Sequence, residues 1–154
     1  MIFSFEGNIS QEVLDKLSNK HKAVINSDES EINKFIKGLL FDHYSFIIGL
    51  GEYSGKDKDR LRIEVVCSNK FRNKVLGQEY KKINISEFLK PSSKSKLAKG
   101  IGNSYCNLIS YLIMKNIKES NQQILYAFIH IPKGFSVEEA ANEINQILKT
   151  ILKD

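Results

Sequence analysis

The sequence predicts a three-layer α/β/α domain built on a mixed, largely parallel sheet. Three observations support this prediction. The first half of the chain alternates short apolar segments with amphipathic helical patterns, a rhythm typical of right-handed parallel crossovers. Two apolar segments, 44–49 and 126–129, are typical of strands buried on both faces. The segment 136–152 has a wide apolar stripe at helical spacing, which indicates a helix packed on the sheet.

The spacing of apolar residues and capping residues predicts the other elements. In chain order they are strand 1–5, a helix from Asn8 or Ser10, strand 23–25, a helix from Ser27 or Asp28, strand 44–49, a glycine-rich turn 49–51, strand 61–67, helix 104–119, strand 123–131 and helix 136–152. In strand 61–67 we expect Ile63, Val65 and Cys67 to share one face. Between 78 and 99 the pattern weakens, and we expect a short irregular element there.

Length and composition predict one domain over residues 1–154. At 42% hydrophobic, the chain has enough apolar residues for a single core. No apolar run approaches the ~20 residues that a membrane span needs, and the N-terminal residues 1–6 lack the basic region of a signal peptide. We therefore predict a cytoplasmic protein without a membrane partner. Cys67 and Cys106 are expected to be free thiols, too few for a thiolate zinc site, and we expect no metal.

The net charge of +5 raises the question of nucleic-acid binding. Lysine dominates the basic residues, acidic residues are interspersed, and no nucleic-acid-binding motif is recognised, so we predict no nucleic-acid partner. The densest basic stretch, 90–99, is expected to be an exposed loop. Gly49-Leu50-Gly51 could begin a dinucleotide-binding loop, but Ser54 stands where the third glycine is required, and we expect no cofactor.

Cys106 and His130 form a candidate catalytic pair. The segment Gly100–Asn107 leads into the predicted helix 104–119 and places Cys106 in its first turn. There the free backbone N–H groups and the helix dipole favour the thiolate over the thiol. His130 follows a predicted buried strand, a position from which a side chain can face a cleft. A nucleophile and a base are the minimum set for a cysteine hydrolase.

Both segments resemble the pyroglutamyl peptidase I family, cysteine peptidases that remove an N-terminal pyroglutamyl residue from peptides. The family's nucleophile segment reads approximately S-x-D-A-G-x-Y-V-C-N, and Gly102, Cys106 and Asn107 match it. Its histidine segment reads F-x-H-I-P, and residues 128–132 (F-I-H-I-P) match it. The resemblance covers residues 44–152, and the N-terminal third in outline. It implies a phosphorylase/hydrolase-like α/β/α fold, with Cys106 as nucleophile and His130 as base.

The resemblance also implies a carboxylate that orients the histidine, and two residues compete for this role. The family carries its catalytic Glu in an E-R-V-A-I-N segment. Matching Arg60-Leu61 to the family's R-V places Asp59 on the Glu position, with one residue deleted in the preceding loop. Glu64 keeps the length of the side chain, but its odd spacing along the strand puts it on the opposite face from Asp59. Asp59 is the first choice and Glu64 the alternative acid.

Four further residues are implied in substrate binding. A family segment G-Q-A-G-G-R lines the substrate pocket and corresponds to 49–51, which implies Leu50 and Gly51. Of the family's ring-binding loop after the first strand, Phe5 is what remains here. Arg72 is the nearest candidate for the arginine that helps to stabilise the oxyanion.

The sequence therefore supports two hypotheses. The first is a cysteine-type exopeptidase that removes a pyroglutamyl group or hydrolyses a related small amide. The second is a catalytically inactive relative that uses the same scaffold for binding or assembly. The expected partner is a peptide or small amide substrate. A homo-oligomer is compatible with the sequence, which leaves the oligomeric state and the true substrate open.

Overall fold

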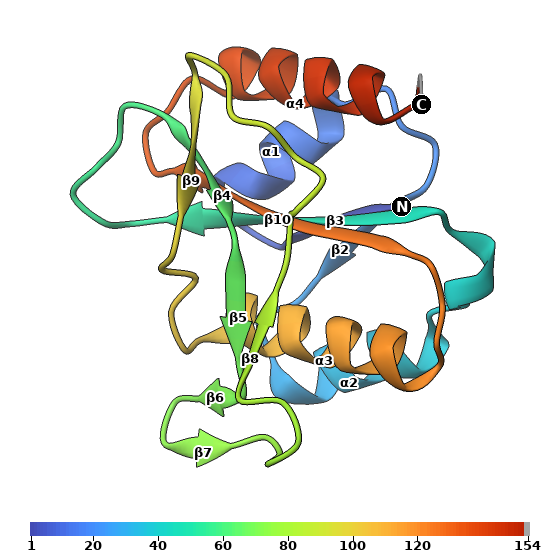
Figure 1. Cartoon of the computed structure of the whole chain (residues 1–154). Helices are drawn as coiled ribbons and strands as arrows, with labels where there is room; N and C mark the ends of the chain where they lie inside the picture. Colours follow the sequence, from blue (N-terminus) through green and yellow to red (C-terminus); the bar gives the residue numbers. More distant parts are fainter. Residues whose placement is uncertain (153–154) are drawn as a thin grey trace.

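The middle layer of the protein is a six-stranded sheet in the order β2-β1-β3-β10-β4-β9 (Figure 1). The computed structural model describes residues 1–152. Its sheet consists of β1 (Ile2–Phe5), β2 (Lys22–Ile25), β3 (Phe46–Tyr53), β4 (Leu61–Glu64), β9 (Ser95–Ala98) and β10 (Leu125–Pro132). The first four strands of the order are parallel, β4 runs antiparallel to β10, and β9 is parallel to β4. The predicted mixed, largely parallel sheet is confirmed.

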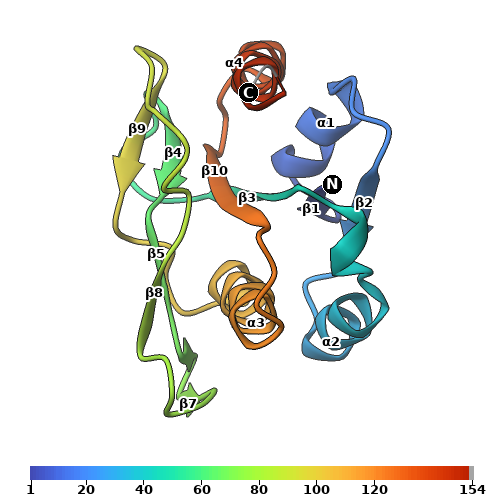
Figure 2. The same cartoon turned by 45° about the vertical axis from the view of Figure 1, so that its right-hand side comes forward.

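Helices form the two outer layers. α1 (Ile9–Lys16) and α4 (Val137–Ile151) cover one face, and α2 (Glu29–Gly38) and α3 (Tyr105–Glu119) cover the other, as Figures 1 and 2 show. A short 3₁₀ helix, Phe41–His43, precedes β3. The three-layer arrangement is the predicted one. No helix among residues 1–152 is long and apolar enough to cross a membrane.

Polar side chains fix the starts of three helices. Asn8, Asp28 and Ser136 each accept a hydrogen bond from a backbone N–H in the first turn of α1, α2 and α4, respectively. These residues are among the caps that the sequence predicts. Ser104, at the start of α3, makes no such side-chain hydrogen bond.

The two faces of the sheet have separate apolar cores, because successive side chains of a strand alternate between faces. Ala127, Ile129 and Ile131 of β10 pack toward α1 and α4, together with Leu50 and Ile63. On the other face, Phe3, Phe5, Tyr126 and Phe128 pack toward α2 and α3. His130 is on the same side of β10 as Phe128, and therefore on the α3 face.

The glycine-rich segment 49–51 is not a turn. β3 continues through it without interruption to Tyr53. A Cβ atom at Gly49 would lie 2.5 Å from the ring of Phe128 and 2.5 Å from that of Phe3. Glycine at this position leaves room for aromatic rings that cross the strand, so this part of the prediction was wrong about conformation.

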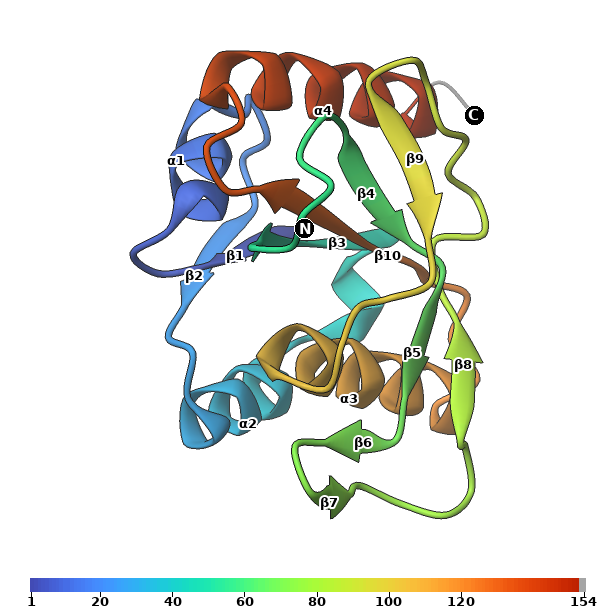
Figure 3. The ribbon, with the colours of Figure 1, turned by 90° about the vertical axis from the view of Figure 1, so that its left-hand side faces the viewer.

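The predicted strand 61–67 is broken at Val65. β4 ends at Glu64, and β5 (Val66–Ser68) pairs with β8 (Lys82–Asn84) in a separate two-stranded sheet. β6 (Lys70–Phe71) and β7 (Lys74–Val75) form a small hairpin between them. We call residues 66–84 the arm; it extends from the main sheet alongside α3 (Figure 3).

This break overturns the expectation that Ile63, Val65 and Cys67 share a face. Ile63 lies in the core under α1 and α4, whereas Cys67 lies in the core under α2 and α3. Cys67 is a buried free thiol, as expected. The strand is interrupted at Val65, so the alternation of side chains between the two faces is not maintained from Ile63 to Cys67.

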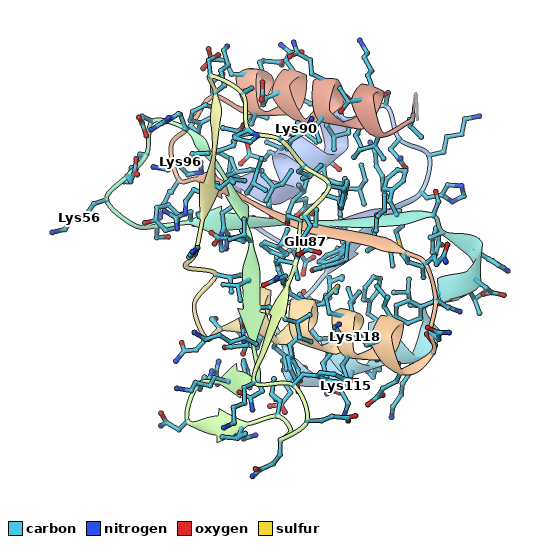
Figure 4. All side chains as sticks on the ribbon, viewed as in Figure 1. Lys56, Glu87, Lys90, Lys96, Lys115 and Lys118 are labelled. Atoms are coloured by element: carbon cyan, nitrogen blue, oxygen red, sulfur yellow. The ribbon has the colours of Figure 1, made fainter. Side chains whose placement is uncertain are left out.

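The basic stretch 90–99 is only partly an exposed loop. Residues Ser95–Ala98 form the edge strand β9, in which Ser95 and Ala98 are buried. Lysines such as Lys56 and Lys90 are solvent-exposed, whereas Lys96 of β9 forms an ion pair with Asp57 (Figure 4). The sequence pattern misses β9 because an edge strand with one wet face has few apolar residues.

Candidate active site

Cys106 lies in the first turn of α3 and points at the sheet. A Cβ atom at Gly51 would lie 2.9 Å from Cys106 Sγ, so the sulfur rests directly on the backbone of β3. Gly51 pairs with His130 in the β3–β10 register. The fold thus brings the predicted nucleophile and the predicted base to the same face and the same level of the sheet.

His130 is paired with Glu64. The Nδ1 atom of His130 lies 2.8 Å from Glu64 Oε1, and both side chains are buried. The carboxylate also accepts hydrogen bonds from Gly100 N–H at 3.0 Å and from Arg62 Nε at 3.2 Å. A carboxylate with these donors is an acceptor, so His130 Nδ1 carries the proton and Nε2 is left free to act as a base.

The charge state of Glu64 follows from these contacts. Burial by itself raises the pKa of the Glu64 carboxyl. The hydrogen bond and charge of His130 oppose this effect, with smaller contributions from Gly100 N–H and Arg62, and together they hold the pKa below its ordinary value. Glu64 is therefore a buried, ionised carboxylate directed at the histidine.

Asp59, the first choice for this role, does not contact His130. It lies in the loop before β4, where it forms ion pairs with Arg60 at 3.5 Å and Lys96 at 3.8 Å, and its side chain is 65% exposed. The prediction of Asp59 as the partner of His130 is wrong, and the alternative, Glu64, makes the contact. The deletion assumed in the loop shifted the alignment of the motif.

A signal for Glu64 was present in the sequence. Residues 64–69 read E-V-V-C-S-N and match E-R-V-A-I-N at its Glu, Val and Asn without a deletion. Two residues that sequence reasoning missed also contribute to the site: Arg62, through its hydrogen bond to Glu64, and Gly100, through its N–H. Arg62 shares a strand face with Glu64, a spacing that the i, i+2 pattern could have revealed.

The resting state of Cys106 differs from the prediction. Burial, with a further contribution from the negative charge of Glu64, raises the pKa of the Cys106 thiol to about 12. The effect of burial exceeds that of the helix start, so Cys106 is a neutral thiol rather than a preformed thiolate. Within the part of the chain that the structure describes, no hydrogen bond joins Cys106 Sγ to His130.

Within residues 1–152, α3 is the α-helix whose first turn has no side-chain cap. Its N-cap residue, Ser104, forms no side-chain hydrogen bond with the first turn, whereas the other three α-helices are capped. Arg72 lies at the same end of the helix: its Nη2 donates to the Tyr105 hydroxyl at 2.7 Å, and its backbone N–H donates to Asn103 O at 2.7 Å. The structure thus places Arg72 beside the helix turn that contains Cys106.

The other predicted substrate residues divide into two groups. Gly51 contacts Cys106, and Phe5 lies buried on the same face of the sheet, with its ring centroid 6.4 Å from that of Phe3. The side chain of Leu50 is fully buried on the opposite face, toward α1 and α4. Only the backbone of Leu50 is left to face the site, because side chains alternate along β3.

Among residues 1–152, no three His, Cys, Asp or Glu side chains are grouped so that they could hold a metal ion. The groups that converge at the site are a thiol, an imidazole and a carboxylate, held by α3, β10 and β4. These three groups are the types that can serve as a nucleophile, a base and an acid that orients the base.

Comparison with known proteins supports the fold. No family model and no curated protein matches the sequence. Solved structures do match. The pyrrolidone carboxyl peptidase from Thermococcus litoralis has a TM-score of 0.79 at 12% identity, over 99% of this chain and 92% of that chain. The pyroglutamyl peptidase I from Bacillus amyloliquefaciens has a TM-score of 0.74 at 16% identity, over 96% and 90%.

A third structure extends the comparison. The pyrrolidone carboxyl peptidase from Fervidobacterium islandicum has a TM-score of 0.79 at 14% identity, over 99% of this chain and 97% of that chain. The resemblance to these peptidases that residues 102–107 and 128–132 indicate is therefore confirmed for the fold, and it extends to the N-terminal third of the chain.

Proposed function

We infer that this protein is a cysteine peptidase that removes an N-terminal pyroglutamyl group, or hydrolyses a related small amide, with Cys106 as the nucleophile. The observation that carries this proposal is the buried His130–Glu64 pair. His130 is paired with Gly51 of the neighbouring strand, and Cys106 Sγ lies against Gly51. The fold shared with structures described as pyrrolidone carboxyl peptidases supports the same class of reaction.

In the proposed mechanism, His130 Nε2 takes the proton of the Cys106 thiol as sulfur attacks the carbonyl carbon. Glu64 accepts the Nδ1 proton in a hydrogen bond and stabilises the imidazolium. Because the pKa of Cys106 is raised to about 12, the thiolate forms together with the imidazolium and not before it. Backbone N–H groups in the first turn of α3, with the guanidinium of Arg72, stabilise the oxyanion.

The tetrahedral intermediate then collapses. The C–N bond breaks, and His130 returns its proton to the leaving amine, which leaves an acyl group on sulfur. Water, deprotonated by the same imidazole, hydrolyses the thioester and restores the thiol. The reaction consumes one water per amide bond and needs neither cofactor nor metal, so we propose a site made of the protein's own backbone and side-chain groups.

We propose a small acyl group for this site. Only residues 6–8 connect β1 to α1, and Phe5 is the aromatic residue at that end of β1. With Gly51 and the backbone of Leu50, Phe5 would form the acyl-binding side of the site. A peptide that begins with a compact cyclic residue meets these requirements. The cytoplasmic location and the assembly into a homo-oligomer stay predictions.

The test is hydrolysis of pyroglutamyl p-nitroanilide, with proline and alanine p-nitroanilides as competing acyl groups. We expect Cys106→Ser and His130→Ala to reduce kcat by about 10³-fold or more, and Glu64→Gln by about 10²-fold. Asp59→Asn is the matched carboxylate control and should retain wild-type activity. Full activity in Cys106→Ser, or a loss in Asp59→Asn equal to that in Glu64→Gln, would overturn the proposal.

The inactive relative is the alternative. It predicts a folded protein that hydrolyses none of these amides. The His130–Glu64 pair argues against it, because burying two ionisable groups has a desolvation cost that a catalytic role accounts for. A folded wild-type protein whose Cys106 alkylates no faster than Cys67 at any pH would favour the inactive relative.

A further inference from the structure

Arg62 is bound to the same carboxylate oxygen as the histidine. Its Nε lies 3.2 Å from Glu64 Oε1, and His130 Nδ1 lies 2.8 Å from that atom. Arg62 reaches Glu64 because the two residues are separated by one position on β4 and therefore share a face. In the β4–β10 register, Arg62 lies directly opposite His130. The three side chains thus form a row, Arg62–Glu64–His130, with Glu64 shared between two partners.

The guanidinium of Arg62 is held in place from two further sides. Its Cζ lies 4.2 Å from the centroid of the Tyr53 ring, and the centroid of that ring lies 6.1 Å from that of His130. On another side, a Cβ atom at Gly100 would lie 3.2 Å from Arg62 Nη2, so the loop that leads to Cys106 passes close to the guanidinium. The Arg62 side chain is only 13% exposed. A planar cation stacked on an aromatic ring keeps a fixed orientation.

The charges around Glu64 explain what this arrangement does. Within residues 1–152, the ionisable groups that lower the pKa of Glu64 are His130 from β10 and Arg62 from β4. The negative charge of Glu64 in turn raises the pKa of Cys106 in α3. A fully buried carboxylate without a cation tends to take up a proton. Arg62 supplies the fixed positive charge that opposes it.

We propose that Arg62, stacked on Tyr53, is a positioning residue that keeps Glu64 ionised and directed at His130. This inference rests on the proposed function and adds a fourth residue to the site. Arg62 does not contact the substrate; it acts through Glu64. Removal of Arg62 should therefore lower the reactivity of Cys106 at low pH, where Glu64 would take up a proton. At high pH the reactivity of Cys106 should be unchanged.

The experiment measures the rate at which chloroacetamide alkylates Cys106 between pH 4 and 9, by mass spectrometry, with Cys67 as the internal reference. We expect Arg62→Gln to shift the acid limb of the profile to higher pH by about one unit. At a given pH on that limb, alkylation of Cys106 is then about tenfold slower. Arg62→Lys keeps the charge, so its acid limb should lie close to that of the wild type. Arg60→Gln removes a neighbouring arginine that pairs with Asp59 instead, and should match the wild type.

Two results would overturn the inference. One is an unchanged acid limb in Arg62→Gln; the other is an equal loss of rate at every pH in both Arg62 variants, which indicates a structural role alone. If Arg62→Gln fails to fold, Tyr53→Leu, which removes only the stacking ring, should shift the acid limb in the same direction. Failure of the proposed function gives a different result: in the wild-type background, His130→Ala would then leave the alkylation rate of Cys106 unchanged at all pH values.

Discussion

At the scale of single residues, Gly51 determines how closely the Cys106 sulfur approaches the sheet. Its missing side chain leaves the space that Cys106 Sγ occupies, because a Cβ atom there would lie 2.9 Å from the sulfur and 2.9 Å from the Phe128 ring. Flexible side chains can yield to such contacts, but Phe128 is fully buried and Cys106 is fixed by its helix. A glycine inside a strand here reflects close packing and not a turn.

Gly51→Ala should therefore displace the sulfur. We expect kcat on the pyroglutamyl anilide to fall by about 10²-fold, because a shift of the nucleophile by an ångström misaligns attack. The free energy of unfolding should fall by about 1–3 kcal/mol from overpacking. Gly38→Ala is the matched control: a Cβ atom there meets nothing within 4 Å, and the substitution should leave activity unchanged. Wild-type activity in Gly51→Ala would contradict the position assigned to Cys106.

At the scale of elements, the site depends on how α3 is attached to the arm. The buried amide of Asn107 accepts from Ser68 N–H at 2.9 Å and donates to the carbonyls of Ser68 and Lys70. This side chain follows Cys106 directly in the sequence. It thus ties the helix turn that contains Cys106 to the segment that leads on from Glu64.

Asn107→Ala should destabilise the protein by about 2–3 kcal/mol, because it leaves buried backbone groups of the arm without partners. Hydrogen exchange should show a local effect, with faster exchange at Ser68 and in its neighbours in the arm than in β1 or β3. Asn116→Ala is the control in the same helix, since Asn116 donates only to the nearby Leu112 carbonyl. Equal effects of the two substitutions would contradict the anchoring role of Asn107.

The elements also show what sequence pattern could and could not provide. Helix starts at Asn8, Asp28 and Ser136 follow from local capping chemistry and were predictable. Cys106 and His130 were likewise identified from local patterns. The choice between Asp59 and Glu64 depended on the β4–β10 register, a contact between segments 66 residues apart in sequence. The acidity of Cys106 depended on burial by several elements, which no local pattern reports.

At the scale of the whole molecule, the sheet order brings the parts of the site together. β3 and β10 are adjacent parallel strands, and the site lies near their carboxyl ends, where open α/β sheets bind ligands. β4 then returns antiparallel beside β10 and supplies Glu64 and Arg62 on the α3 face.

The buried carboxylate makes global stability depend on pH. The pKa of Glu64 is lowered in the folded protein, so its contribution to stability is present above the pKa of the unfolded chain and is lost as the pH falls below 4.5, the ordinary value. We expect Glu64→Gln to unfold at a lower temperature than wild type at pH 7, with the difference narrowing toward pH 3. Thermal unfolding followed by circular dichroism measures this. A difference that stays constant with pH would contradict an ionised Glu64.

The central claim is that Cys106 is the nucleophile activated by His130, and trapping of the acyl-enzyme tests it most directly. Wild-type protein is mixed with a pyroglutamyl p-nitrophenyl ester, quenched in acid within the first turnover, digested and analysed by mass spectrometry. We predict a pyroglutamyl adduct on the peptide that contains Cys106, none on the peptide that contains Cys67, and slower formation of the adduct in His130→Ala. Turnover of the ester with no adduct on Cys106, or an adduct that forms equally fast without His130, would contradict the claim.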